Sequence, residues 1–242
     1  MNNYLSYAEA DELCDGMIRQ YIGKDAPIPA FIDIDGFVMD FLHCRIIYET
    51  FAEDDPDKVG FTGDGKTPLR VRRNSMVGTI VLPPNTVVLE RFLLRPEEEK
   101  RRRFVLGHEA GHIIASRINP DTPKNHACFH RVFDAEREYE ASELAELYHI
   151  SEWQANTFSA GLLMPRFLMR DKLSRFNGGR RIPVYGDAVF HPREKVILNK
   201  MADSLNVSYT ALTIRLKRLG MLKHHDISEY ITKELQLGGD RR

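Results

Sequence analysis

The stretch His108-Glu109-Ala110-Gly111-His112 matches the pattern H-E-x-x-H and decides most of what the sequence predicts about this chain. On a helix, residues four positions apart lie on one face, so the imidazoles of His108 and His112 can bind one metal ion. Glu109 lies beside them and can take up or release a proton. We therefore expect His108 and His112 to be metal ligands and Glu109 to be the catalytic residue of a hydrolase.

The flanking residues predict that this stretch lies on a helix. Before it, Pro96 suits a first helical turn, and the three glutamates at 97–99 complement the positive end of the helix dipole. After it, the Asn-Pro pair at 119–120 ends the helix. Gly111 costs about 1 kcal/mol relative to alanine in a helix, and a close contact with a second helix would explain its presence.

A catalytic zinc site has three protein ligands and one position left for water, so a third ligand is needed. Glu152 is the best candidate, because it lies early in an otherwise apolar helix that begins at residue 150 or 151. Asn156, one turn later on the same side, is expected to hold a ligand in place by a hydrogen bond. The large apolar residues of this helix are expected in the core, and they are Trp153, Phe158, Leu162 and Leu163.

Other residues compete for the role of third ligand, and the sequence leaves them open. They lie between the two helices, and they are Glu136, Glu140, Glu143, His126 and His130. The glutamates among them belong to a highly charged segment, which favours solvent-facing positions.

The chemistry that this site predicts is the hydrolysis of a peptide bond. A bound zinc ion lowers the pKa of its water toward neutrality and polarises the scissile carbonyl. Glu109 would accept the proton of that water and later deliver it to the leaving amine. A donor to the oxyanion is also expected, and the sequence offers Tyr185, His191, His126 and His130 without choosing among them.

At these residues the chain resembles the ImmA/IrrE family of metallopeptidases. The resemblance is carried by H-E-A-G-H at 108–112, by E-W-Q-A-N-T-F-S-A at 152–160 and by G-L-L-M-P at 161–165. The order of helices and short strands also fits, so the resemblance covers about residues 5–222. The charged segment at 134–148 departs from the family pattern and resembles an insertion.

The resemblance implies a zinc ion bound by His108, His112 and Glu152. It also implies that Glu109 is catalytic and that the core is thermolysin-like, that is, zincin-like. The implied substrate is a protein, a helix-turn-helix transcriptional repressor whose cleavage releases its genes, often on a mobile element.

Around these motifs the sequence predicts an α+β protein that is mostly helical. Helices at 7–22 and 33–42 precede short strand-like runs, which we expect to form a small antiparallel sheet. At 195–222, two helices joined by a tight turn give a helix-turn-helix outline. We expect a metallopeptidase domain at 1–190 and a helical C-terminal segment at 191–242 packed on it.

Composition and charge narrow the classes of function. The net charge of −1 over 242 residues draws the chain neither to nucleic acid nor to a membrane surface. The three cysteines form no C-x-x-C pair, which argues against a thiolate zinc site and a disulfide framework. The start of the chain has no basic, apolar leader and no stretch is long and apolar enough to span a bilayer, so we expect a cytoplasmic protein.

Two rival functions stay open at this point. One is a non-cleaving anti-repressor that binds its partner, with a metal site that only stabilises the fold. The other is a regulator that binds DNA through Arg215, Lys217 and Arg218. Basic residues near a helix C-terminus are also what the helix dipole favours, so we expect this segment to pack on the rest of the chain without binding nucleic acid. The pair His224-His225 is expected to be part of an exposed tail.

Overall fold

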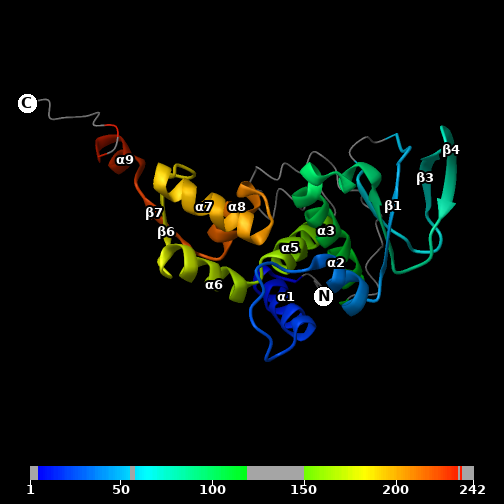
Figure 1. Cartoon of the computed structure of the whole chain (residues 1–242), viewed down its shortest axis with the longest axis horizontal. Helices are drawn as coiled ribbons and strands as arrows, with labels where there is room; N and C mark the ends of the chain where they lie inside the picture. The colour runs from blue at the N-terminus through cyan, green and yellow to red at the C-terminus, as the bar shows by residue number, and fades with distance from the viewer. Residues whose placement is uncertain (1–4, 55–57, 119–149, 234, 236–242) are drawn as a thin grey trace, which may run out of the picture.

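The computed structural model describes residues 5–54, 58–118, 150–233 and 235 (Figure 1). It has the expected α+β composition. The helices are α1 (Tyr7–Ile22), α2 (Ile34–Gly36), α3 (Glu99–Ile118), α5 (Ile150–Leu163), α6 (Arg166–Asn177), α7 (Pro192–Leu205), α8 (Tyr209–Arg218) and α9 (Ile227–Lys233). The strands are β1 (Arg45–Glu49), β2 (Gly60–Thr62), β3 (Pro68–Arg73), β4 (Met76–Val81), β5 (Thr86–Glu90), β6 (Ile182–Tyr185) and β7 (Leu222–His225). Within these residues, no helix is both long and apolar enough to cross a membrane.

The main sheet has three strands in the order β1-β5-β2, and it is mixed. β5 runs parallel to β1, with Val88 opposite Ile47, and antiparallel to β2, with Val88 opposite Phe61. The prediction of an antiparallel sheet is therefore wrong for β1 and β5. Parallel neighbours need a long connection, and here the chain passes through β2, β3 and β4 before it returns beside β1.

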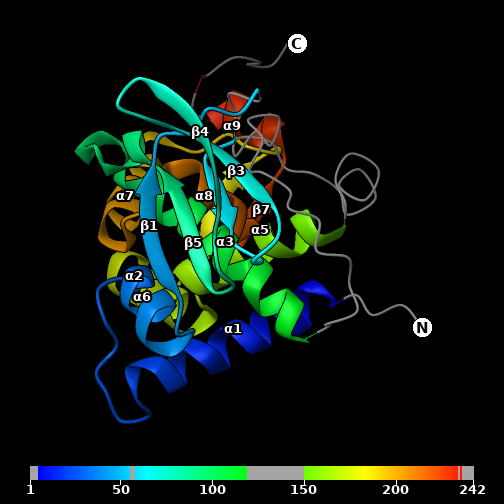
Figure 2. The same ribbon diagram turned by 90° about the vertical axis from the view of Figure 1, so that its right-hand side faces the viewer.

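The two faces of this sheet bury different partners, because side chains alternate along a strand. Val87 and Leu89 of β5 belong to the main core, together with Val105 of α3. Val88 points to the other face and joins a second cluster with Leu69 of the β3–β4 hairpin. The sheet thus lies between α3 and the hairpin, as Figure 2 shows.

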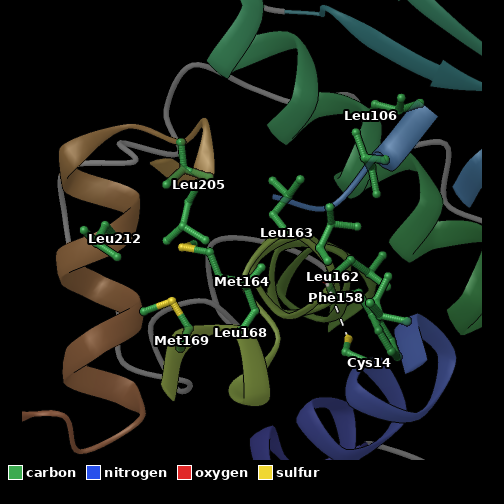
Figure 3. Packing of buried hydrophobic residues seen from close by; sticks show 14 of the residues in the cluster. Cys14, Leu106, Phe158, Leu162, Leu163, Met164, Leu168, Met169, Leu205 and Leu212 are labelled. Atoms are coloured by element: carbon green, nitrogen blue, oxygen red, sulfur yellow. Dashed lines mark hydrogen bonds between the residues drawn. The ribbon is translucent and has the colours of Figure 1, made fainter. Parts of the chain in front are cut away.

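The main core is built around α5. Phe158, Leu162 and Leu163 are fully buried, as predicted, and they pack between α1, α3 and the C-terminal helices (Figure 3). The thiol of Cys14 on α1 faces the carbonyl oxygen of Phe158 at 3.8 Å. The prediction that Trp153 is a core residue is wrong, because it is only half-buried at the surface between α1 and α5.

The C-terminal residues form the predicted helix-turn-helix outline from α7 and α8, and Ser208 caps α8 by accepting a hydrogen bond from the amide of Ala211 at 3.1 Å. His224 and His225 are not a tail, because they belong to β7, which pairs with β6 in parallel. Since β6 precedes residue 190 and β7 follows it, strand pairing crosses the expected domain boundary. The division at that residue stays a prediction.

Two arginines of α8, Arg215 and Arg218, make contacts with other helices of the chain. Arg215 is buried and its guanidinium bonds to Asp11 at 2.6 Å and to the carbonyl oxygen of Met164 at 3.0 Å. The guanidinium of Arg218 stacks over the ring of Tyr7, 4.8 Å from its centre. These contacts attach α8 to α1 and to the end of α5.

Candidate metal centre

α3 and α5 bring three metal-ligating side chains together. His108 Nε2 lies 3.0 Å from His112 Nε2 and 3.2 Å from Glu152 Oε2, and His112 Nε2 lies 3.1 Å from Glu152 Oε1. His108 and Glu152 are buried, whereas His112 is partly exposed. This group of two imidazoles and one carboxylate could hold a metal ion.

Glycines let the two helices approach closely enough for these ligands to meet. A Cβ on Gly111 would lie 2.7 Å from the carbonyl oxygen of Ala155, and one on Gly107 would lie 2.8 Å from Ser159 Oγ. The atom near Gly111 belongs to the backbone of α5 and cannot turn aside, so the backbones of α3 and α5 are in direct contact at this point. The close helix contact that Gly111 predicted is confirmed.

Asn156 orients the first histidine. Its Oδ1 lies 2.8 Å from His108 Nδ1 and accepts a hydrogen bond from that nitrogen. The proton of the neutral imidazole is then on Nδ1, and the lone pair of Nε2 points toward His112 and Glu152. The structure therefore shows the hydrogen bond from a ligand to Asn156 that was predicted from the sequence.

The electrostatics of the group favour a bound cation. Burial opposes the charged form of His108, but the hydrogen bond and the negative charge of Glu152 outweigh it and raise the pKa of His108. Burial also opposes the charged form of Glu152, but the two histidines lower the pKa of this carboxyl to about 2. The carboxylate is thus ionised at neutral pH in a buried position, where a positive charge stabilises it.

Glu109 lies beside the three ligands and is almost fully buried, with 1% of its surface exposed. Its Oε2 accepts a hydrogen bond from the hydroxyl of Thr62 at 2.7 Å, while no described group donates to the buried Oε1. Burial raises the pKa of Glu109, which makes its carboxylate a better proton acceptor. One oxygen is held in place, and the other is available for a proton.

Two residues of β2 next to Glu109 were not identified from the sequence. A Cβ on Gly60 would collide with Glu109 Oε1, so only glycine lets β2 run this close to α3. A glycine within a strand-like run can indicate such an approach, and that signal was available. Thr62 carries no comparable signal, because its contact with Glu109 joins segments that are distant in sequence.

The first turn of α5, which carries Glu152, is anchored from its other side. Trp153 donates a hydrogen bond from Nε1 to the hydroxyl of Tyr7 on α1 at 2.7 Å, and the two rings meet edge to face with centres 4.7 Å apart. Glu152 and Trp153 therefore fix this turn to α3 and to α1 respectively.

The predicted oxyanion donors Tyr185 and His191 are not brought to this site. Tyr185 lies on β6 with its ring against those of His225 and Tyr230, at 5.2 and 5.3 Å. Figure 1 shows β6 separated from α3 by α7 and α8. His191 caps α7 and faces Glu194. These two residues were predicted from residue type alone, and in the structure both make contacts away from the three ligands.

The remaining candidates of the sequence lie outside the described residues. They are His126, His130, Glu136, Glu140 and Glu143.

No protein-family model matches the chain, and no curated protein matches it either.

Proposed function

We propose that this chain is a zinc-dependent endopeptidase with a zincin-like core and that it cleaves a helix-turn-helix transcriptional repressor. The observation that carries the proposal is the meeting of His108, His112 and Glu152 beside the buried Glu109. Two imidazoles and a glutamate are a ligand set of catalytic zinc in metallopeptidases, with one position left for water.

The separations of the three ligand atoms fit zinc. Bonds of about 2.0–2.1 Å at tetrahedral angles place ligand atoms about 3.3 Å apart. The ligand atoms lie 3.0, 3.1 and 3.2 Å apart. Calcium and magnesium prefer sites made of oxygen ligands, so the two nitrogens favour zinc over these two ions. When bound, zinc supplies Lewis-acid chemistry, acidifying a water and polarising a carbonyl.

The residues of the chain supply the proton transfers. Glu109 Oε1 accepts the proton of the attacking water and delivers it to the leaving amine. Thr62 keeps the carboxylate oriented through Oε2, at 2.7 Å. In the neutral ring of His108, Asn156 holds the proton on Nδ1, through the 2.8 Å contact, and so leaves the lone pair of Nε2 directed at the other ligands.

An extended peptide has a place to bind beside Glu109. β2 is an outer strand of the main sheet in the described part of the chain, and it carries both Gly60 and Thr62. A peptide backbone can pair with an outer strand of a sheet. The choice of a repressor as the substrate is supported by the motif resemblance of 108–112 and 152–165.

The test is a cleavage assay with the purified chain, zinc and the helix-turn-helix repressor encoded next to it. We expect the wild type to cut the repressor and Glu109→Gln to bind zinc without cutting. Glu97→Gln removes an exposed glutamate just before α3 and should cut like the wild type. A repressor that stays intact but leaves its operator with the wild type and with Glu109→Gln would instead identify a non-cleaving anti-repressor.

A further inference from the structure

A strongly basic region lies around α6 and the end of α8, although the whole chain has a net charge of −1. The segment 166–181 contains six basic residues and one acidic residue, and 215–223 contains four basic residues and no acidic one. The pairing of β6 with β7 brings the ends of these segments together, with Ile182 opposite Leu222. Such a local excess of one charge attracts ligands of the opposite sign.

A cavity of about 240 Å³ opens in this region. Part of its wall is apolar, made by Leu173, Leu219 and Met221. The rest includes three arginines, Arg166, Arg170 and Arg181, and no acidic residue of the described chain lines it.

The arginines differ in how much of their charge is already compensated. Arg166 is paired with Glu12 and Asp15 of α1. Arg170 and Arg181 are exposed, and within the described residues neither makes an ion pair or a side-chain hydrogen bond. The acid next in sequence, Asp171, is directed to Arg175 at 2.8 Å. Two guanidinium groups at the cavity are thus available to a ligand.

We propose that this cavity binds the phosphate group of a small organic phosphate, of the size of a nucleoside monophosphate. A guanidinium presents parallel N–H groups that match two phosphate oxygens, and Arg170 and Arg181 would hold the phosphate in this way. The apolar wall of Leu173, Leu219 and Met221 would take the organic part of the ligand.

Nucleic acid fits this region less well than a small phosphate does. A polymer is held by many cations along a track. The neighbouring arginines that would extend such a track are occupied, since Arg215 is buried against Asp11 and Arg218 stacks on Tyr7. The cavity itself offers one concave site with two uncompensated guanidinium groups on its wall, those of Arg170 and Arg181.

The experiment measures binding of adenosine monophosphate, inorganic phosphate and a short DNA duplex by calorimetry at fixed ionic strength. The pocket variant is Arg170→Gln/Arg181→Gln. The matched control is Arg180→Gln/Arg193→Gln, which also removes two exposed arginines but leaves the cavity wall unchanged. Melting temperatures of both variants establish that they fold.

We expect adenosine monophosphate to bind more tightly than inorganic phosphate. Its affinity should fall about 10- to 100-fold in the pocket variant, as for the loss of charged hydrogen bonds, and less than about twofold in the control. Absence of binding to the wild type, or an equal loss in both variants, would overturn the proposal. DNA binding that ignores the pocket substitutions and falls steeply with salt would overturn it in favour of a nucleic-acid surface.

Discussion

Gly111 of α3 and Ala155 of α5 touch through their backbones. A Cβ on Gly111 would fall 2.7 Å from the carbonyl oxygen of Ala155 and 2.8 Å from its Cα. His112 follows the first residue directly, and Glu152 lies one turn before the second. The spacing of these two backbones therefore sets the distance between His112 and Glu152, which is 3.1 Å from Nε2 to Oε1.

Gly111→Ala is expected to separate the two helices, because the new methyl group has no room. We predict a loss of about 1–3 kcal/mol in the free energy of unfolding, typical of overpacking, together with weaker zinc binding. Gly16→Ala is the control, since it lies within α1 with nothing within 4 Å of a new Cβ, and it should gain about 0.5–1 kcal/mol. Denaturant unfolding measures the stability of the two variants, and competition with a chelator measures their zinc affinity. A Gly111→Ala variant with the stability and zinc affinity of the wild type would show that the contact does not set the ligand spacing.

Asn156→Ala is expected to weaken zinc binding by about 10- to 100-fold, the usual cost of losing a partner that orients a ligating histidine. The reason is the 2.8 Å hydrogen bond to His108 Nδ1. Asn156→Asp keeps an acceptor at this position and should retain zinc. Competition with a chelator measures both affinities, and equal affinities for Asn156→Ala and the wild type would argue against the orienting role.

Zinc affinity is expected to rise with pH. In the metal-free chain, burial disfavours protonated His108, but Glu152 outweighs it and holds the pKa of this histidine above its ordinary value of 6.5. Because this folded-state pKa is raised, the stabilisation is complete below about pH 6.5 and is lost as pH rises through the raised pKa. Zinc displaces the same proton, so affinity should fall about tenfold per unit below that pKa. Chelator competition at several pH values checks this, and a flat profile would contradict it.

Tyr7→Phe is expected to loosen the first turn of α5, since it removes the hydroxyl that accepts the 2.7 Å bond from Trp153. We predict about a two- to tenfold loss in zinc affinity, the size expected for one neutral hydrogen bond. Trp153 is the only tryptophan of the chain, so tryptophan fluorescence reports the surroundings of this residue. Tyr48→Phe is the control, because that hydroxyl bonds to Arg102, on the part of α3 before the ligands. Equal zinc affinities of Tyr7→Phe and Tyr48→Phe would contradict the role of Tyr7 in anchoring α5.

The helices of the candidate site were predictable because their signals are local. Pro96 and the glutamates after it marked the approach to α3, and an isolated carboxylate in an apolar helix marked Glu152. Gly111 even indicated that the two helices would touch. Each of these predictions depended only on residues within or next to a single helix.

What escaped prediction depends on contacts between distant segments. The parallel pairing of β1 with β5 and the bond from Thr62 to Glu109 join residues that no local pattern connects. Arg215 has the sequence context of a surface cation, yet it is buried against Asp11 from the other end of the chain. Tyr185 and His191 were selected by residue type, which carries no information about position in the fold, and both make their contacts away from the three ligands.

Anomalous diffraction at the zinc edge, from crystals of the zinc-loaded chain, tests the central claim most directly. The account predicts one strong peak within bonding distance of His108 Nε2, His112 Nε2 and a carboxylate oxygen of Glu152. A peak at other residues, such as His126 or His130, or no peak between these three side chains, would contradict it.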